Sequence, residues 1–282
     1  MHTAVVGAGY IGTRVLRLLG PGQAVAFSRS AVDEFPARLL DLDGDVGLLG
    51  DIPRRILYTV PPPFRSDGDP RLARLLAALP EPPERIVYLS TTGVYGDLGN
   101  RVASESMAPA PGSPRARRRL AAEDLLQSWC AQHESLCIIL RVPGIYGPGR
   151  LGLDRIEARE PVIREEESNP GNRIHADDLA SAAIAALSRN IPAGIYNVGD
   201  GDPRSSTWFR LTVARLAGLE APPMVSREEA FQTFPASRLS FLKESRRLDT
   251  RKMREVLGFQ PQYADAEDGI RASLADDGRL PA

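Results

Sequence analysis

The chain has 282 residues, of which 43% are hydrophobic, and its 35 basic and 36 acidic residues leave a formal net charge of -1. This composition supports one large domain, or one domain with a smaller lobe, and it excludes the strongly basic class of nucleic-acid-binding domains. No apolar run approaches the ~18 residues of a membrane span, and no signal peptide is evident. Cys130 and Cys137 have no metal-ligand spacing. We therefore expect a cytoplasmic protein with reduced thiols, no metal, and no nucleic-acid or membrane partner.

Short apolar runs alternate with helical patterns through the first 150 residues. Strands are predicted at 3–6, 24–27, 47–49, 56–60, 85–89 and 137–142, and helices at 11–19, 72–79 and 120–133. Strands that alternate with helices predict a parallel sheet covered on both faces and joined by right-handed connections. The sequence therefore predicts a doubly wound α/β fold.

The alternation weakens after about residue 150. A helix at 176–187 and a strand at 194–198 are predicted to return to the sheet, whereas helices at 206–217 and 250–257 are assigned to a smaller lobe. The polar stretch 151–172, which contains "REEESNPGN", is predicted to be a flexible loop. We therefore divide the chain into a main domain (1–150, joined by 176–198) and a smaller substrate lobe (151–282).

The first predicted strand leads into "VVGAGYIG", which places Gly7, Gly9 and Gly12 in G-x-G-x-x-G spacing. The first glycine permits a tight turn, the second lets a pyrophosphate approach the backbone, and the third lets the helix pack closely on the strand. A helix that begins at Tyr10 and Ile11 would offer its free N–H groups and its positive dipole end to the phosphates. The strand before the motif and the helix after it are the context that supports a Rossmann-type dinucleotide site.

The second predicted strand ends in Ser28, Arg29 and Ser30, where an acidic residue would bind the ribose hydroxyls of NAD. Two hydroxyls and a guanidinium suit a 2′-phosphate, because arginine pairs with phosphate through two hydrogen bonds. This pattern favours NADP over NAD, although an exposed loop arginine would give the same sequence. Asp41, followed by Leu42, is the candidate for the adenine edge.

Four further segments carry a family resemblance: "RIVYLSTTGVYGD" (85–97), "LRVPGIYGPGR" (140–150), "RIHADDLASAAIAAL" (173–187) and "YNVGDGDP" (196–203). Together with the glycine loop they resemble the extended short-chain dehydrogenases of the NAD-dependent epimerase/dehydratase family, over residues 1 to about 265. The segment "LDTRKMREVLGFQPQY" is similar to the C-terminal part of the family's shorter, atypical members.

In active members of that family, a Ser or Thr after the fifth strand polarises the substrate, and a Tyr-x-x-x-Lys pair handles the proton and holds the nicotinamide ribose. The resemblance places Thr91 at the first position, with Thr92 beside the substrate. Arg119 falls on the Lys position and could still bind ribose hydroxyls. Arg115 falls on the Tyr position, and a guanidinium cannot serve as a general acid or base in this range.

Three residues are candidates for the missing proton donor or for substrate contact, and each has a structural alternative. Tyr95 follows Thr91 by four residues and is the first choice, Tyr146 could stack or donate at the nicotinamide, and His175 would be a tunable acid-base group. The remaining cofactor contacts are expected where the fourth and sixth predicted strands end: Thr59, Val60 and Pro61, and Pro143, Gly144 and Ile145.

Two functions are compatible with this pattern. The first is an NADP-dependent oxidoreductase or epimerase-like enzyme that acts on a small carbonyl or hydroxyl compound or on a nucleotide-sugar-like substrate. The second is a non-catalytic NADP-binding redox sensor or scaffold, which would explain the absent tyrosine equally well. Arg117 and Arg118 belong to a solvated helix face or grip an anionic substrate, and a homodimer is expected through the helices at 72–79 and 120–133.

Overall fold

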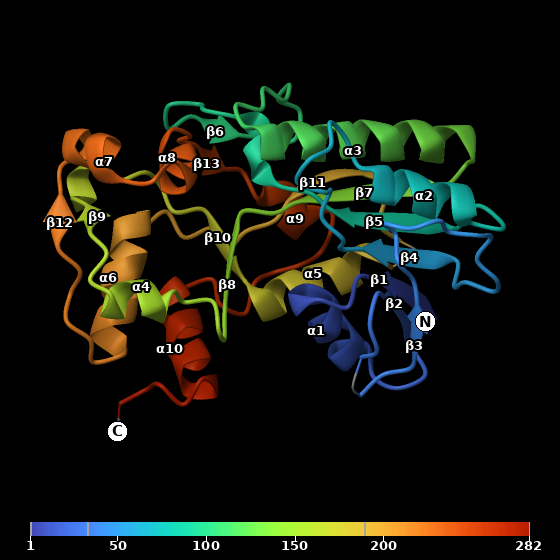
Figure 1. Cartoon of the computed structure of the whole chain (residues 1–282), viewed down its shortest axis with the longest axis horizontal. Coiled ribbons are helices and arrows are strands. Elements are labelled where there is room, and N and C mark those ends of the chain that lie inside the picture. The colour runs from blue at the N-terminus through green and yellow to red at the C-terminus, as the bar shows by residue number, and fades with distance from the viewer. Residues whose placement is uncertain (1, 33, 189, 282) are drawn as a thin grey trace.

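The computed structural model describes residues 2–32, 34–188 and 190–281. A parallel sheet with helices on both faces forms one side of the molecule, and a smaller group of helices and short strands forms the other (Figure 1). The N-terminus lies on the sheet side and the C-terminus on the side of the smaller lobe. This arrangement confirms the predicted Rossmann-type α/β fold.

Within the described residues, seven strands form the central sheet in the order β11-β7-β5-β4-β1-β2-β3, and every pairing is parallel. The strands of the inner part are buried on both faces, which is why they appear in the sequence as continuous apolar runs. The strands are β1 (Thr3–Val6), β2 (Ala24–Ser28), β3 (Ala37–Leu39), β4 (Arg55–Tyr58), β5 (Arg85–Leu89), β7 (Leu136–Arg141) and β11 (Gly194–Asn197).

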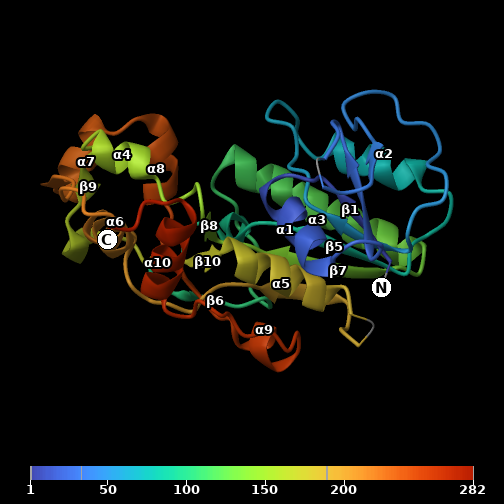
Figure 2. The ribbon, with the colours of Figure 1, turned by 90° about the horizontal axis from the view of Figure 1, so that it is seen from below.

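Two pairs of helices cover the sheet. On one face lie α1 (Tyr10–Leu19) and α5 (Ala176–Ala186), and on the other lie α2 (Pro70–Ala78) and α3 (Pro114–Gln132) (Figures 1 and 2). Leu72 and Leu75 of α2 and Leu126 of α3 are completely buried in this second core. The homodimer expected through α2 and α3 stays a prediction.

The smaller lobe is assembled mainly from the second half of the chain, and α6 packs against α10 in it. Its elements are β8 (Gly144–Tyr146), α4 (Leu153–Glu157), β9 (Val162–Ile163), η2 (Glu165–Glu167), β10 (Arg173–His175), α6 (Ser206–Leu216), β12 (Met224–Val225), α7 (Arg227–Thr233), α8 (Ala236–Leu242) and α10 (Ala266–Asp276). Three further short elements are η1 (Thr92–Tyr95), which contacts α3, and β6 (Val102–Ala103) and β13 (Arg247–Leu248), which pair with each other.

The structure departs from the predicted elements at four places. The strand predicted at 47–49 is wrong: Leu48 is exposed, and the edge strand is β3, formed by Ala37–Leu39. The helix predicted at 120–133 begins earlier, at Pro114, because the Ser113 hydroxyl caps it by accepting a hydrogen bond from the Ala116 N–H (3.3 Å). The stretch 151–172 forms α4, β9 and η2, rather than one irregular loop.

The fourth departure concerns the helix predicted at 250–257 in the smaller lobe. The corresponding helix α9 (Arg251–Glu255) packs against β11, and Met253 and Leu257 are buried in the core beneath the sheet. The last strand of the sheet is therefore covered by a segment that comes late in the chain. Among the described residues, no helix has both the length and the apolar character needed to cross a bilayer.

Candidate active site

Three of the cavities that the described residues form, at the carboxyl-terminal edge of the sheet and on the smaller lobe, contain most of the predicted site residues. The glycine-loop cavity (about 320 Å³) is lined by Gly7, Gly9 and the residues that follow β2 and β4. The Thr91 cavity (about 480 Å³) is lined by the residues that follow β5 and β7 and by α3. The lobe cavity (about 1000 Å³) lies between β8, α4 and α6. Ligands of doubly wound sheets bind at this edge of the strands.

The glycine loop has the close packing that the motif predicts. A Cβ atom at Gly7, where φ is +98°, would lie 2.6 Å from the Thr59 Oγ1 and 2.8 Å from the Val60 Cγ2, and a Cβ at Gly12 would overlap the Gly7 carbonyl oxygen. At Gly9, in contrast, a Cβ would meet nothing within 4 Å. The loop is therefore closed toward the protein and open on the side from which a pyrophosphate would approach.

The N-terminus of α1 is also suited to an anion. Its N-cap is Gly9, and in the described part of the chain no side chain accepts a hydrogen bond from its first turn. By contrast, Asp69 caps α2 by accepting from the Leu72 N–H (3.0 Å). Free N–H groups and the helix dipole together favour a bound phosphate. The residues present therefore fit a dinucleotide.

The side chains of Tyr10 and Ile11 do not line the glycine-loop cavity. The Tyr10 hydroxyl donates to the Pro148 carbonyl (2.8 Å), and its ring lies between Arg14 and Arg150, each guanidinium carbon 3.8 Å from the ring centre. Ile11 is buried in the core between α1 and the sheet. Only their backbone groups, in the first turn of α1, are in position for the phosphates.

Most of the other residues predicted to contact the adenosine half gather in the same cavity: Ser28, Arg29, Ser30, Leu42, Thr59, Val60 and Pro61. Thr59 donates to the Gly7 carbonyl (2.6 Å) and fixes the glycine loop against the end of β4. Asp41 is different, because it is exposed, is not among the lining residues, and accepts from the Asp43 N–H (3.0 Å). The adenine contact expected of Asp41 therefore has no support from its position.

Sequence reasoning missed Asp43 and Arg71, which both line the glycine-loop cavity. The Asp43 carboxylate accepts two hydrogen bonds from Arg71, both 2.6 Å, and lies 3.4 Å from Arg29. The hydrogen bond from Arg71 lowers the pKa of Asp43. Two guanidinium groups thus meet on one anionic group at the rim of the cavity. The only sequence signal was an arginine in the first turn of the helix that follows the Pro-rich loop.

The Thr91 cavity brings together the residues predicted for the reactive half of the site: Thr91, Thr92, Arg119, Pro143, Gly144 and Ile145. Thr91 caps η1 by accepting from the Gly93 N–H (3.1 Å). Arg119 donates to the Leu89 carbonyl (2.8 Å) and to the Tyr88 hydroxyl (3.0 Å), which fixes its guanidinium at the end of β5. Arg115, one turn earlier on α3, lines the same cavity.

Tyr95 lies outside this cavity, which differs from its expected role as proton donor. It is completely buried, its hydroxyl donates to the Asn197 Oδ1 (2.7 Å), and its ring lies 4.7 Å from the Arg141 guanidinium carbon. Arg141 in turn forms a buried ion pair with Glu123 (2.7 Å). Burial raises the pKa of the Tyr95 phenol. This network fixes Tyr95 beneath the site, away from a substrate.

His175 and Tyr146 also have structural partners in place of the predicted substrate contact. His175 is buried, its Nδ1 accepts from the Asp177 N–H (3.2 Å) to cap α5, and its Nε2 pairs with the Ser273 hydroxyl (3.1 Å). Burial lowers the pKa of this imidazole. Tyr146 lines the lobe cavity, but its hydroxyl is buried and points toward α10, where a Cβ at Gly269 would overlap it.

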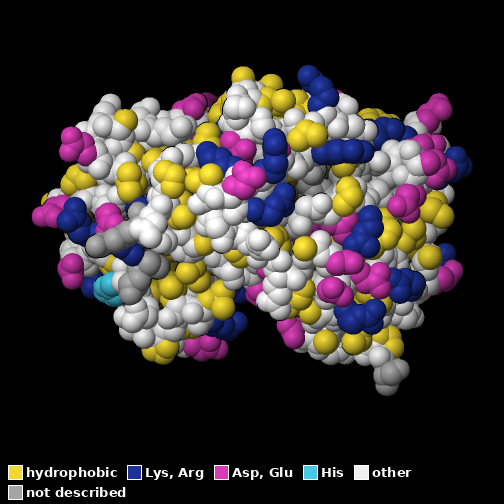
Figure 3. All heavy atoms as spheres, turned by 180° about the vertical axis from the view of Figure 1, so that it is seen from behind, with side chains coloured by type: hydrophobic (Ala, Val, Ile, Leu, Met, Phe, Trp, Pro, Cys, Tyr) yellow, Lys and Arg dark blue, Asp and Glu magenta, His cyan; other side chains and the backbone are white. Residues whose placement is uncertain are grey.

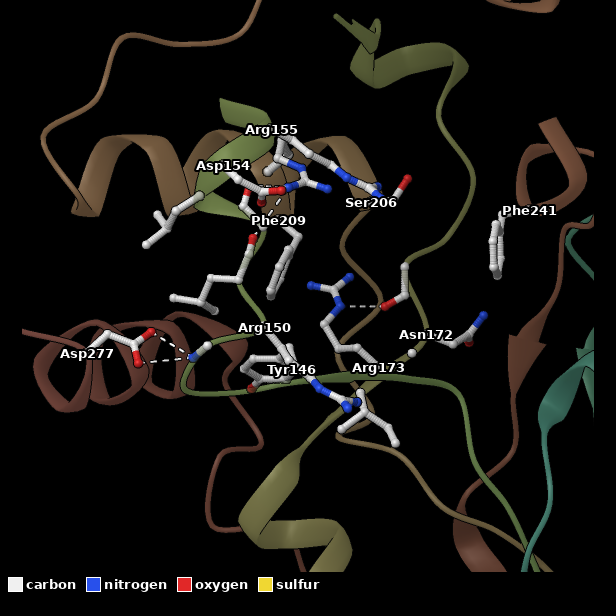
Figure 4. Close-up of a pocket in the computed structure, with 18 residues that line it drawn as sticks. Tyr146, Arg150, Asp154, Arg155, Asn172, Arg173, Ser206, Phe209, Phe241 and Asp277 are labelled. Atoms are coloured by element: carbon white, nitrogen blue, oxygen red, sulfur yellow. Dashed lines mark hydrogen bonds between the residues drawn. The ribbon is translucent and has the colours of Figure 1, made fainter. Parts of the chain in front are cut away.

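Four arginines line the lobe cavity: Arg150, Arg155, Arg173 and Arg210. Figure 4 shows Arg150, Arg155 and Arg173 reaching it from the loop after β8, from α4 and from β10. The Asp277 carboxylate at its edge accepts from the Gly149 N–H (2.8 Å), and one buried nitrogen of Arg173 has no hydrogen-bond partner. Elsewhere the charges are mixed: basic and acidic side chains are interspersed on the face in Figure 3.

Comparison with known proteins gives the same picture. The model of the NAD dependent epimerase/dehydratase family matches residues 71–199. The UDP-glucose 4-epimerase of Mycolicibacterium smegmatis is 30% identical over 95% of this chain and 96% of that protein. The human dTDP-D-glucose 4,6-dehydratase is 29% identical, but over 48% of this chain and only 39% of its own length.

Solved structures share the fold over almost the whole chain. A functionally unknown conserved protein from Silicibacter pomeroyi has a TM-score of 0.77 and 28% identity, covering 98% of both chains. The UDP-glucose 4-epimerase of Thermus thermophilus, solved with NAD, has a TM-score of 0.73 and 23% identity, covering 99% of both chains. With the glycine loop, the Thr91 cavity and a full-length relative in agreement, the chain belongs to the NAD-dependent epimerase/dehydratase family.

Proposed function

We propose that this protein is an NADP-dependent oxidoreductase or epimerase-like enzyme that acts on a nucleotide-sugar-like substrate without the family's tyrosine. The proposal rests on one observation: most of the residues predicted for the site line two cavities. The residues predicted for the adenosine half line the glycine-loop cavity, and those predicted for the reactive half line the Thr91 cavity. Both cavities lie at the carboxyl ends of the strands, where this fold binds its ligands.

The preference for NADP is supported by the arginines at the glycine-loop cavity. Arg29 and Arg71 meet on the Asp43 carboxylate, so the rim already holds two cations around one anionic group. A 2′-phosphate has the charge and the acceptor oxygens to replace Asp43 in that arrangement. The hydroxyl groups of Ser28 and Ser30 lie in the same lining. The NAD bound to the Thermus thermophilus relative makes NAD the alternative cofactor.

A nucleotide-sugar-like substrate is supported by the lobe cavity. Its four arginines suit a diphosphate, because guanidinium groups bind phosphate oxygens through paired hydrogen bonds. Asn172, Ser206 and Phe241 line both this cavity and the Thr91 cavity, so the two spaces adjoin. A substrate with its nucleotide part in the lobe would therefore reach Thr91 with its sugar. The named relatives that act on nucleotide-linked sugars agree with this assignment.

The chemistry assigned to the chain's own residues is orientation and polarisation. Thr91 is positioned to hydrogen-bond a carbonyl or hydroxyl of the substrate, and Arg119 to hold the nicotinamide ribose. A bound NADP(H) supplies or accepts the hydride. The described residues that line the Thr91 cavity include no tyrosine and no histidine. We assign the proton to water or to the substrate itself.

The same observation favours the second candidate, a non-catalytic NADP-binding sensor or scaffold. Loss of one positioned acid or base costs about 10²–10⁴-fold in rate, so slow turnover would still indicate an enzyme. The test is NADPH oxidation and epimer formation over a panel of nucleotide sugars and small carbonyl compounds. Wild type is compared with Thr91→Ala and with the control Thr233→Ala, which changes the same residue type in α7, outside the cavities.

Turnover that falls at least tenfold (about 1.4 kcal/mol) in Thr91→Ala and is unchanged in Thr233→Ala would support the enzyme. Tight NADPH binding without turnover on any substrate would support the sensor. Turnover that survives Thr91→Ala at the wild-type rate would contradict the assigned role of Thr91.

A further inference from the structure

Arg115 is a guanidinium that lines the Thr91 cavity with no acceptor of its own. None of the hydrogen bonds or ion pairs within the described residues uses its nitrogens, and its contact is a ring, with the guanidinium carbon 4.3 Å from the centre of Phe241. Stacking on an aromatic ring leaves the N–H groups at the edge of the guanidinium free to donate. Arg115 is exposed at the edge of the cavity, but desolvation of its guanidinium by the surrounding chain lowers its pKa; Glu244 opposes this, and the nearby charges of Arg119 and Arg246 lower it further.

A second arginine reaches the same cavity from the segment between α8 and β13. The side chain of Arg246 is only 13% exposed. One of its terminal nitrogens, Nη1, donates to the Gly96 carbonyl (2.6 Å) and to the Glu244 carboxylate (3.0 Å). Its buried Nε has no partner, and no hydrogen bond within the described residues uses Nη2. The hydrogen bonds of Nη1 therefore fix Arg246 in place, and its Nε and Nη2 groups remain free to donate to a ligand.

The charges in this part of the cavity do not balance. Arg119 is committed to the end of β5 through the Leu89 carbonyl. Glu244 is the acidic residue among the described lining residues, and it faces both Arg115 and Arg246. Counting Arg119, three guanidinium groups of the described residues line the cavity against this one carboxylate, which leaves a surplus of two positive charges. Because Arg119 already donates to the Leu89 carbonyl and the Tyr88 hydroxyl, the donors left for an anion are those of Arg115 and Arg246, and the two oxygens of one carboxylate can accept from both.

We propose that Arg115 and Arg246 form a receptor for a carboxylate on the reacting end of the substrate, so that this enzyme acts on a nucleotide-linked sugar acid. This inference rests on the proposed function, because the lobe cavity holds the nucleotide part. Arg115 occupies the position at which the family resemblance would place the tyrosine. An arginine at this position lacks the proton donor of a tyrosine, but it adds a guanidinium that can bind an anion in the Thr91 cavity.

The experiment compares UDP-glucuronate with UDP-glucose, which differ by a carboxylate in place of a hydroxymethyl group. Their dissociation constants, and that of UDP alone, are measured by calorimetry on the full chain saturated with NADP. The variants are Arg115→Ala, Arg115→Lys and the control Arg118→Ala. Arg118 is on the same helix, and its contact is with Phe64 outside this cavity, so the control removes the same charge.

We expect wild type to bind UDP-glucuronate about 10-fold more tightly than UDP-glucose, the lower end of the range for a hydrogen-bonded charge pair, because Arg246 is mostly buried whereas Arg115 is exposed. Arg115→Ala should abolish that preference, Arg115→Lys should restore part of it, and UDP should bind all the variants equally. Arg118→Ala should behave as wild type. Equal affinity for the two sugars in wild type, or a preference that survives Arg115→Ala, would overturn the inference.

A failure of the proposed function would give a different result from a failure of the carboxylate receptor. If UDP itself does not bind, the nucleotide-sugar assignment fails, and the carboxylate receptor is then tested with glucuronate 1-phosphate against glucose 1-phosphate. A preference for the acid in that pair, lost in Arg115→Ala, would support the receptor without the nucleotide. No preference in that pair would refute it.

Discussion

Arg71→Ala tests the proposed coenzyme preference with a magnitude that the structure allows us to estimate. The Arg71 side chain is 18% exposed, and it donates to the Pro61 carbonyl (3.0 Å), so its guanidinium is positioned before any phosphate arrives. A hydrogen bond between charged groups contributes about 1.5–3 kcal/mol, and 1.4 kcal/mol is about tenfold in affinity. Arg71→Ala should therefore weaken NADPH binding by about 10- to 100-fold.

Arg29 provides the matched comparison, because its side chain is 69% exposed. Exposed ion pairs contribute about 0–1 kcal/mol, so Arg29→Ala should weaken NADPH binding by at most about fivefold. Arg71→Ala also leaves Asp43 without its main partner, and the double variant Arg71→Ala/Asp43→Asn removes that residual charge. If repulsion by Asp43 is a large part of the effect, the double variant regains affinity for NADPH.

The assay is a fluorescence titration of each variant with NADPH and with NADH. NADH lacks the 2′-phosphate, so its affinity should change little in either arginine variant. An equal loss for both coenzymes would refute the reasoning, because it would show that Arg71 supports the loop and does not bind the phosphate. Unchanged NADPH affinity in Arg71→Ala would refute it as well.

Three further predictions concern the buried polar groups. Glu123→Ala leaves Arg141 buried without its partner and should lower the free energy of unfolding by about 3–5 kcal/mol, as measured by urea denaturation. A loss below about 1 kcal/mol would contradict the view that the two residues form a buried ion pair. Tyr95→Phe should lower the free energy of unfolding by about 1–3 kcal/mol, because the Asn197 Oδ1 loses its buried donor, and turnover should stay near that of wild type. A large fall in kcat would show that Tyr95 takes part in catalysis. Burial raises the pKa of Asp200 to about 8, so the folded chain keeps a proton that the unfolded chain loses near its ordinary pKa of 3.8. The contribution of Asp200 to stability is thus complete at low pH and is lost as the pH rises toward about 8; urea denaturation across this range should show a smaller decline in Asp200→Asn, and an identical decline would contradict the assignment.

The fold was predictable because its inner strands are buried on both faces and because glycine spacing has a direct steric cause. The edge strand was not, since Ala37–Leu39 is short and largely exposed, whereas 47–49 has the apolar residues of a strand without a partner. The same limit applies to the boundary of the lobe. Met253 looks like any apolar helix residue until its packing beneath β11 is seen.

Within the site, residues adjacent to a strand end were predictable and residues defined by distant partners were not. Thr91 and Arg119 follow from local position and from the family resemblance. Tyr95 is held by Asn197, 102 positions further along the chain, and His175 by Ser273, 98 positions further along. Nothing local in the sequence reveals such pairings. Arg71 was missed for the same reason, because only the tertiary fold brings it to Asp43.

The central claim is that the opening glycines hold a dinucleotide whose reactive half faces Thr91. Titration of the wild-type chain with NADPH and NADH tests it most directly. We predict one saturable site for NADPH, with NADH at least about tenfold weaker. The absence of saturable binding for both coenzymes would contradict the account.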